Sequence, residues 1–124
     1  MGGEINQVIL NLLINASHAI GDVVSESPGS RGSITVSTHA IENSVEIRIA
    51  DTGKGIPEAV RSRIFEPFFT TKDVGKGTGQ GLALAHATVV GRHSGQIWFE
   101  TVIGRGTTFF IRLPLVAARE EKAA

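Results

Sequence analysis

The sequence predicts a single domain of the α/β class, in which two helices accompany two β-hairpins. Apolar residues recur at intervals of three and four between positions 5 and 20, the pattern of an amphipathic helix. Four shorter segments alternate apolar and polar residues, and they form two pairs joined by turn residues. A chain of 124 residues, 41% of them hydrophobic, is long enough to bury one core and too short for several domains.

The two predicted helices differ in their surroundings. The helix at 5–20 has one apolar face, and the connection after it, 22–32, is rich in Ser, Gly and Pro and should be exposed. The helix from 81 to about 93 is apolar on nearly all sides and should be buried. We expect Gly95 to end this helix in the left-handed conformation.

The strands are predicted at 33–39 and 45–50, and at 96–102 and 107–113. Turn residues at 42–44 join the first pair, and a turn that contains Gly104 and Gly106 joins the second, which ends at Pro114. Between the hairpins, 51–80 is a glycine-rich segment with weak periodicity, which indicates either a binding lid or an element that the pattern does not reveal.

The charge balance excludes several kinds of partner. Twelve basic and twelve acidic residues cancel, so the chain lacks the positive surface of a nucleic-acid-binding protein. With no cysteine there is no disulfide, thiol nucleophile or thiolate metal site. We find no apolar run near the length of a membrane span and no signal peptide. We therefore expect a cytoplasmic domain that makes no membrane contact itself.

Glycine is concentrated where a ligand could approach the backbone. Ten of the fifteen glycines lie between positions 53 and 106, and the run at 75–81 leads into the start of the predicted second helix. Such a junction can bind an anion, although a flexible loop without a ligand explains the run equally well. The P-loop and dinucleotide-binding motifs do not occur.

Polar residues form a stripe beside the apolar face of the first helix: Gln7, Asn11, Asn15, His18 and Asp22. Amide oxygens are suitable ligands for Mg²⁺, which keeps several waters and bridges to substrate phosphates. A solvated helix edge is the alternative for any one of these residues.

A carboxylate follows directly on the predicted strand at 45–50, in the sequence DTGKGIP at 51–57. Asp51 at this strand end could accept a hydrogen bond from an exocyclic amine such as that of adenine. A helix cap or an Asx turn is an equally good explanation of this heptapeptide taken alone.

Together these motifs resemble the catalytic and ATP-binding domain of sensor histidine kinases, in the superfamily that includes gyrase B, a heat-shock chaperone and mismatch-repair ATPases. The similarity extends from Asn6 to Pro114, with four blocks in the family's order: NQVILNLLINASHAI, DTGKGIP, IFEPFFTTK and GKGTGQGLALA. It implies a two-layer α/β sandwich with a mixed, mostly antiparallel sheet and helices on one face, the Bergerat or GHKL ATP-binding fold. On this basis 1–116 is the ATP-binding catalytic domain, trimmed before its first strand, and 117–124 is a flexible tail.

The resemblance also implies roles for individual residues. Asn15 corresponds to the asparagine that binds Mg²⁺, Asn11 lies beside the γ-phosphate, and Asp51 binds the adenine amine. Thr107 corresponds to a hydroxyl that approaches adenine through water. Phe65, Phe68 and Phe69 correspond to aromatic residues that anchor the lid. The remaining expected ATP contacts are His18, Gly53, Gly55, Ile56, Lys72, Gly77, Thr78, Gly79, Gln80, Gly81 and Leu82.

The implied activity is transfer of the γ-phosphate of Mg-ATP to a histidine on a separate dimerisation domain of the same parent protein, with a response regulator downstream. None of the chain's four histidines, His18, His39, His86 and His93, stands in an acceptor context, so we do not expect the chain to autophosphorylate alone. The parent protein could be anchored in a membrane.

Three other functions are compatible with this resemblance: a regulatory ATP-binding module, a serine kinase of the anti-sigma type, and an ATP hydrolase. The complete block at 64–72 favours the sensor kinase over the first two. Asn11 stands where the superfamily's hydrolases carry a glutamate, and an amide cannot accept a proton from water near neutral pH.

Overall fold

In the computed structural model of the chain, the described residues are 2–26, 29, 31–66 and 81–114. They form, in chain order, α1 (Gly2–Glu26), β1 (Ile34–Ile41), β2 (Ser44–Asp51), the 3₁₀ helix η1 (Glu58–Arg63), α2 (Gly81–His86), its π-helical continuation η2 (Ala87–Arg92), β3 (Gln96–Val102) and β4 (Gly106–Pro114). The predicted tail at 117–124 lies outside these residues.

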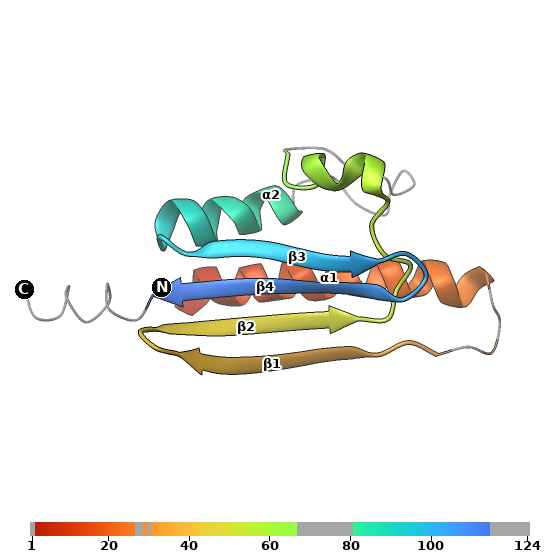
Figure 1. The fold of residues 1–124 in the computed structure, drawn as a ribbon, viewed down its shortest axis with the longest axis horizontal. Helices are drawn as coiled ribbons and strands as arrows, with labels where there is room; N and C mark the ends of the chain where they lie inside the picture. The colour runs from red at the N-terminus through yellow and green to blue at the C-terminus, as the bar shows by residue number, and fades with distance from the viewer. Residues whose placement is uncertain (1, 27–28, 30, 67–80, 115–124) are drawn as a thin grey trace, which may run out of the picture.

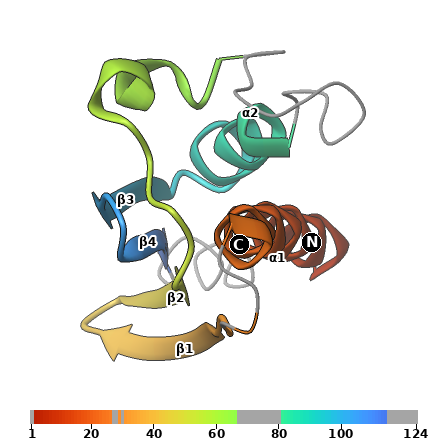
Figure 2. The ribbon, with the colours of Figure 1, turned by 90° about the vertical axis from the view of Figure 1, so that its right-hand side faces the viewer.

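The four strands form one sheet in the order β1-β2-β4-β3 (Figure 1). Each hairpin pairs internally, and β2 of the first hairpin joins β4 of the second. Helices α1 and α2 lie on the same side of this sheet (Figure 2). The expected two-layer α/β sandwich is therefore confirmed, and every pairing among the described strands is antiparallel.

Helix α1 covers the centre of the sheet because its apolar residues return at helical spacing. Val8, Leu12 and Ala16 are at most 2% exposed. Contrary to the expectation from the sequence, 3–25 would pass for a membrane span by length and composition, a test that buried core helices also pass. Packing accounts for only part of this apolar character, because 17% of the span is buried, and Leu10 and Ile14 are 47% and 46% exposed. The core consists of Val8, Leu12, Ile47, Ile49, Ile64, Ala85, Val89, Phe109 and Ile111.

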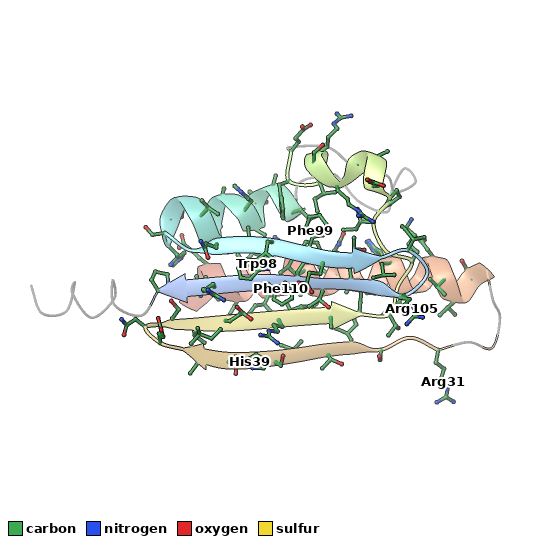
Figure 3. All side chains as sticks on the ribbon, viewed as in Figure 1. Arg31, His39, Trp98, Phe99, Arg105 and Phe110 are labelled. Carbon is green, nitrogen blue, oxygen red and sulfur yellow. The ribbon has the colours of Figure 1, made fainter. Side chains whose placement is uncertain are left out.

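No helix of the described residues lies on the outer face of the sheet, opposite α1 and α2 (Figure 2). Trp98 of β3 and Phe110 of β4 stack there, with ring centroids 5.1 Å apart and planes 4° from parallel (Figure 3). The guanidinium groups of Arg48 and Arg112 lie over Phe110 and Trp98, and both bind Glu46, which is only 2% exposed. These side chains cover the outer face of β2, β4 and β3.

The start of α1 is joined to the end of η2. The Glu4 carboxylate pairs with Arg92 and lies 3.2 Å from Nε2 of His93. On α2, His86 packs against Phe65, with ring centroids 5.2 Å apart. His86 and His93 therefore have structural contacts. The prediction that this helix is buried is only partly correct: Ala85 and Val89 are buried, but Leu84 and Val90 are 55% and 40% exposed.

One prediction about the backbone is wrong. Ser94, with φ of 55°, is the left-handed residue after η2, and Gly95 has no positive φ. Gly95 is needed for a different reason: a β-carbon there would lie 2.5 Å from the carbonyl oxygen of Arg112. The 3₁₀ helix η1 was also not predicted within 51–80.

Candidate functional site

Asp51 ends β2 beside Thr107 of β4, its partner in the strand register. Both are buried, with exposed fractions of 8% and 5%. Oδ1 of Asp51 accepts a hydrogen bond from the Gly53 N–H at 2.8 Å. Burial raises the pKa of the Asp51 carboxyl, and the backbone N–H groups of Gly53 and Thr107 partly offset this. Asp51 is thus a desolvated hydrogen-bond acceptor at the edge of the core.

The two glycines after Asp51 allow the chain to pass close to its neighbours. A β-carbon at Gly53 would lie 2.6 Å from Cβ of Ala19 in α1. Gly55 has φ of +84°, and a β-carbon there would lie 2.8 Å from the carbonyl oxygen of Val102. The glycine loop at 52–56 therefore runs between α1 and the end of β3.

Thr101 connects this loop to β4. Its hydroxyl accepts a hydrogen bond from the Ile56 N–H at 2.9 Å and lies 2.9 Å from the hydroxyl of Thr107. Ile56 itself packs against the core.

The polar stripe of α1 faces the same region. Near the start of the stripe, one turn after Gln7, Nδ2 of Asn11 lies 3.4 Å from the carbonyl oxygen of Gly81, the first residue of α2. At the other end, Asp22 forms an ion pair with Lys54 of the glycine loop, with 2.9 Å between Oδ2 and Nζ. Asn15 and His18 lie on the same helix edge between these contacts, half-buried.

The structure thus brings most of the described site residues to one side of α1. Asp51, Gly53, Gly55, Ile56 and Thr107 form one end of the region, and Asn11 with Gly81 forms the other. Leu82 packs against the core next to Gly81. The other expected contacts lie outside the described residues: Lys72, Gly77, Thr78, Gly79 and Gln80, together with Phe68 and Phe69.

The oxygen atoms of this region are suited to a cation such as Mg²⁺ that takes most of its ligands from phosphate and water and few from the protein. Within the described parts of the chain, no three His, Cys, Asp or Glu side chains gather in a way that could hold a metal ion. The half-buried amide of Asn15 offers a neutral oxygen ligand. Mg²⁺ is commonly held by few protein groups, with phosphate oxygens and water completing its shell, so the residues fit this ion.

Three contacts of the site were not predicted from the sequence. The Lys54–Asp22 ion pair and the close approach of Ala19 to Gly53 depend on the packing of α1, which no local pattern reveals. Thr101 did carry a signal, because it follows Ile97 and Phe99 on the inner face of β3. A hydroxyl on an apolar strand face requires a buried partner.

The fold and this site define an ATP-binding domain of the GHKL type. Residues 3–117 match the family described as "Histidine kinase-, DNA gyrase B-, and HSP90-like ATPase", and the chain belongs to this family.

Among individual relatives, the chain is 38% identical to the sensor kinase CckA of Brucella abortus, over 98% of this chain and 13% of that protein. It is also 38% identical to the sensor histidine kinase ZraS of Escherichia coli, over 95% of this chain and 23% of that protein. The chain therefore spans less than a quarter of the length of these two relatives.

Solved structures of histidine kinases also resemble this chain. The catalytic domain of the histidine kinase ThkA superposes with a TM-score of 0.73 at 33% identity, over 90% of this chain and 66% of that one. Full-length ShkA in complex with AMPPNP superposes with a TM-score of 0.73 at 28% identity, over 90% of this chain and 21% of that one. The chain thus resembles the ATP-binding domains of sensor histidine kinases in sequence and in fold.

Proposed function

We propose that residues 1–116 bind Mg-ATP and donate its γ-phosphate to a histidine on a separate dimerisation domain of a two-component sensor kinase. The observation that carries this proposal is the position of Asp51, a buried carboxylate at a strand end that shares one side of α1 with the amides of Asn11 and Asn15.

Asp51 is suited to bind the adenine amine. A carboxylate has room for about four hydrogen bonds, and the backbone of Gly53 and Thr107 accounts for two. An exocyclic amine can use the remaining capacity. Because Asp51 is desolvated, a nucleotide lacking this amine leaves the acceptor unsatisfied, which disfavours its binding.

The other end of the site is suited to phosphates. Asn15 would hold Mg²⁺ by its amide oxygen, and the bound ion would neutralise charge on the β- and γ-phosphates. Asn11 lies one helical turn earlier, against the first residue of α2. Its amide can orient a phosphate oxygen but cannot remove a proton from water, so the γ-phosphoryl group is preserved for a better nucleophile.

The acceptor lies outside this chain in the proposed reaction. The nucleophile is an imidazole nitrogen on the dimerisation domain, the γ-phosphorus–oxygen bond breaks, and ADP leaves. A response regulator then takes the phosphoryl group. The domain works on the cytoplasmic side, in a parent protein that is anchored in the membrane or free.

Calorimetric titration with AMPPNP, with and without Mg²⁺, tests the nucleotide site. We expect micromolar binding, about −8 kcal/mol, by the unaltered chain. Asp51→Asn should weaken it, and Asn15→Ala should abolish its dependence on Mg²⁺. Asn6→Ala, on an exposed position of α1, is the matched control and should bind normally. A folded chain that binds no nucleotide would overturn the proposal.

Phosphoryl transfer needs a second experiment. The chain is mixed with a dimerisation hairpin that carries the acceptor histidine and with γ-labelled ATP. Acid-labile label on the hairpin is the expected result. If nucleotide binds but no label reaches the histidine, the kinase assignment fails and the regulatory binding module becomes the better description.

A further inference from the structure

Gln7 is the first polar residue of the stripe on α1, one helical turn before Asn11. Its Nε2 donates a hydrogen bond to Oδ1 of Asn11 at 3.0 Å. Residues four apart on a helix lie on the same face, so the spacing of the two amides accounts for this contact. Gln7 is exposed and Asn11 is half-buried, so the bond leads from the surface of α1 into the site.

Two contacts determine which way the Asn11 amide points. The carbonyl oxygen of Gly81 can only accept a hydrogen bond, so the Asn11 atom that lies 3.4 Å from it is the donor Nδ2. The oxygen is at the other end of the same planar amide, and it accepts from Gln7. A reversed Asn11 amide would bring two carbonyl oxygens together at Gly81, which is unfavourable.

Gln7 provides the stronger of the two restraints on this amide. The bond from Gln7 to Asn11 is 3.0 Å long, close to the most common length for N–H···O bonds. The contact between Asn11 and Gly81 is longer, at 3.4 Å, and therefore weaker. Without Gln7, only this weaker contact would hold the Asn11 amide in its orientation.

The orientation decides what Asn11 can do at a phosphate. Its amide nitrogen carries two N–H groups, so it can donate to the Gly81 carbonyl and also to a phosphate oxygen. A hydrogen bond from N–H to a phosphate is strengthened by the phosphate charge. An amide turned the other way would present its oxygen to the phosphate oxygens, and two acceptors repel each other.

We propose that Gln7 is a positioning residue that keeps the N–H groups of Asn11 turned toward the phosphates by donating to its Oδ1. Asn11 then acts as a hydrogen-bond donor during phosphoryl transfer, and Asn15 supplies the amide oxygen for Mg²⁺. This inference rests on the proposed function of the site as an ATP site. Gln7 acts through Asn11 and need not touch the nucleotide.

The kinetic test measures phosphoryl transfer from Mg-ATP to the acceptor hairpin by the unaltered chain, Gln7→Glu and Gln7→Ala. Glutamate keeps the shape of glutamine but has no proton to donate at neutral pH, so it favours the reversed Asn11 amide. We expect kcat to fall about 3- to 10-fold in Gln7→Glu, the range of one hydrogen bond. Gln7→Ala should lower kcat about 2-fold, the range of one side-chain pair on a helix. KM for Mg-ATP should change little, because the adenine and Mg²⁺ contacts remain.

Asn6→Glu is the matched control, because it adds the same charge at the neighbouring exposed position of α1 and should keep kcat. A double-mutant cycle isolates the path through Asn11. In an Asn11→Ala background, Gln7→Glu and Asn6→Glu should have equal effects on kcat. Thermal unfolding of every variant checks that the fold is retained.

The side-chain amide signals of Asn11 in ¹⁵N NMR spectra report on the hydrogen bond without any nucleotide. They should shift in Gln7→Glu and in Gln7→Ala, and they should stay in place in Asn6→Glu. If the Asn11 signals do not respond to Gln7, the inference is overturned.

Failure of this inference can be distinguished from failure of the proposed function. If the unaltered chain phosphorylates the hairpin and Gln7→Glu lowers kcat no more than Asn6→Glu does, Gln7 has no positioning role and only this inference is overturned. If the unaltered chain binds no nucleotide or transfers no phosphoryl group, the proposed function falls and this inference falls with it.

Discussion

Gly53 and Ala19 lie in such close contact that a β-carbon on Gly53 would stand 2.6 Å from that of Ala19. The carbonyl carbon of Ala19 and Oδ1 of Asp51 would be 2.8 and 2.9 Å away. A backbone atom cannot rotate out of the way as a flexible side chain can. The contact therefore fixes the distance between α1 and the glycine loop.

Gly53→Ala should destabilise the fold and weaken nucleotide binding, because α1 or the loop must shift. We expect a loss of about 1–3 kcal/mol in the free energy of unfolding, typical of overpacking. Gly21→Ala is the contrasting variant: Gly21 lies in α1 with open space around it, and alanine there should stabilise by about 0.5–1 kcal/mol. Denaturant unfolding measures both, and equal effects would contradict the assigned contact.

Asp51→Asn should change how stability depends on pH. The folded pKa of Asp51 is raised, so the native state holds its proton more tightly than the unfolded state. The stability that Asp51 contributes is present below the unfolded pKa, about 3.9, and falls as pH rises through the folded pKa. Asparagine has no proton to lose, so the variant should gain stability relative to the unaltered chain over this window. If the difference in the free energy of unfolding between the variant and the unaltered chain stays constant from pH 4 to neutral pH, this prediction is wrong.

Glu46→Gln should show the opposite dependence. Hydrogen bonds from Arg112 and Arg48 lower the pKa of Glu46, so its contribution is present above the unfolded pKa, about 4.3, and is lost as pH falls through the folded value. The variant should be less stable than the unaltered chain at neutral pH, and the gap should close in acid. Glu42→Gln is the control: it removes the same charge from the exposed β1–β2 turn. A gap that does not depend on pH would show that the carboxylate charge is irrelevant.

Asn11→Glu should convert the site toward hydrolysis. A glutamate at this position of α1 supplies the proton acceptor that the amide lacks, and general base catalysis contributes about 100-fold or more. We expect phosphate release from ATP to rise by at least tenfold without a partner domain, with Asn11→Gln as the control of similar size. No rise in the glutamate variant would mean that the base position lies elsewhere.

The sequence was most informative where structure depends on local spacing. The stripe of Val8, Leu12 and Ala16 predicted α1, but the helix continues to Glu26, and the prediction of an exposed connection from residue 22 was wrong there. Alternation predicted all four strands to within two residues at either end. Asp51 was recognised because it follows a strand and precedes two glycines. The spacing of apolar residues can be read from a single sequence because it depends only on residues of the same helix or strand.

Contacts between distant segments could not be predicted in this way. The pairing of β2 with β4 makes Asp51 and Thr107 neighbours, and only the resemblance to a family suggested that the two act together. The residue after η2 shows another limit. A glycine is the usual left-handed residue, but Gly95 was needed for its small size beside β4, and Ser94 took the left-handed conformation instead.

Helix α1 touches the glycine loop at Ala19 and the first residue of α2 at Asn11. Eight residues of α-helix separate these contacts by about 12 Å along the axis, since each residue adds about 1.5 Å. A helix in the core is stiff, so it sets this separation as a fixed length rather than an adjustable one. The helix thus holds the two ends of the proposed nucleotide site, at Asp51 and at Gly81, a fixed distance apart.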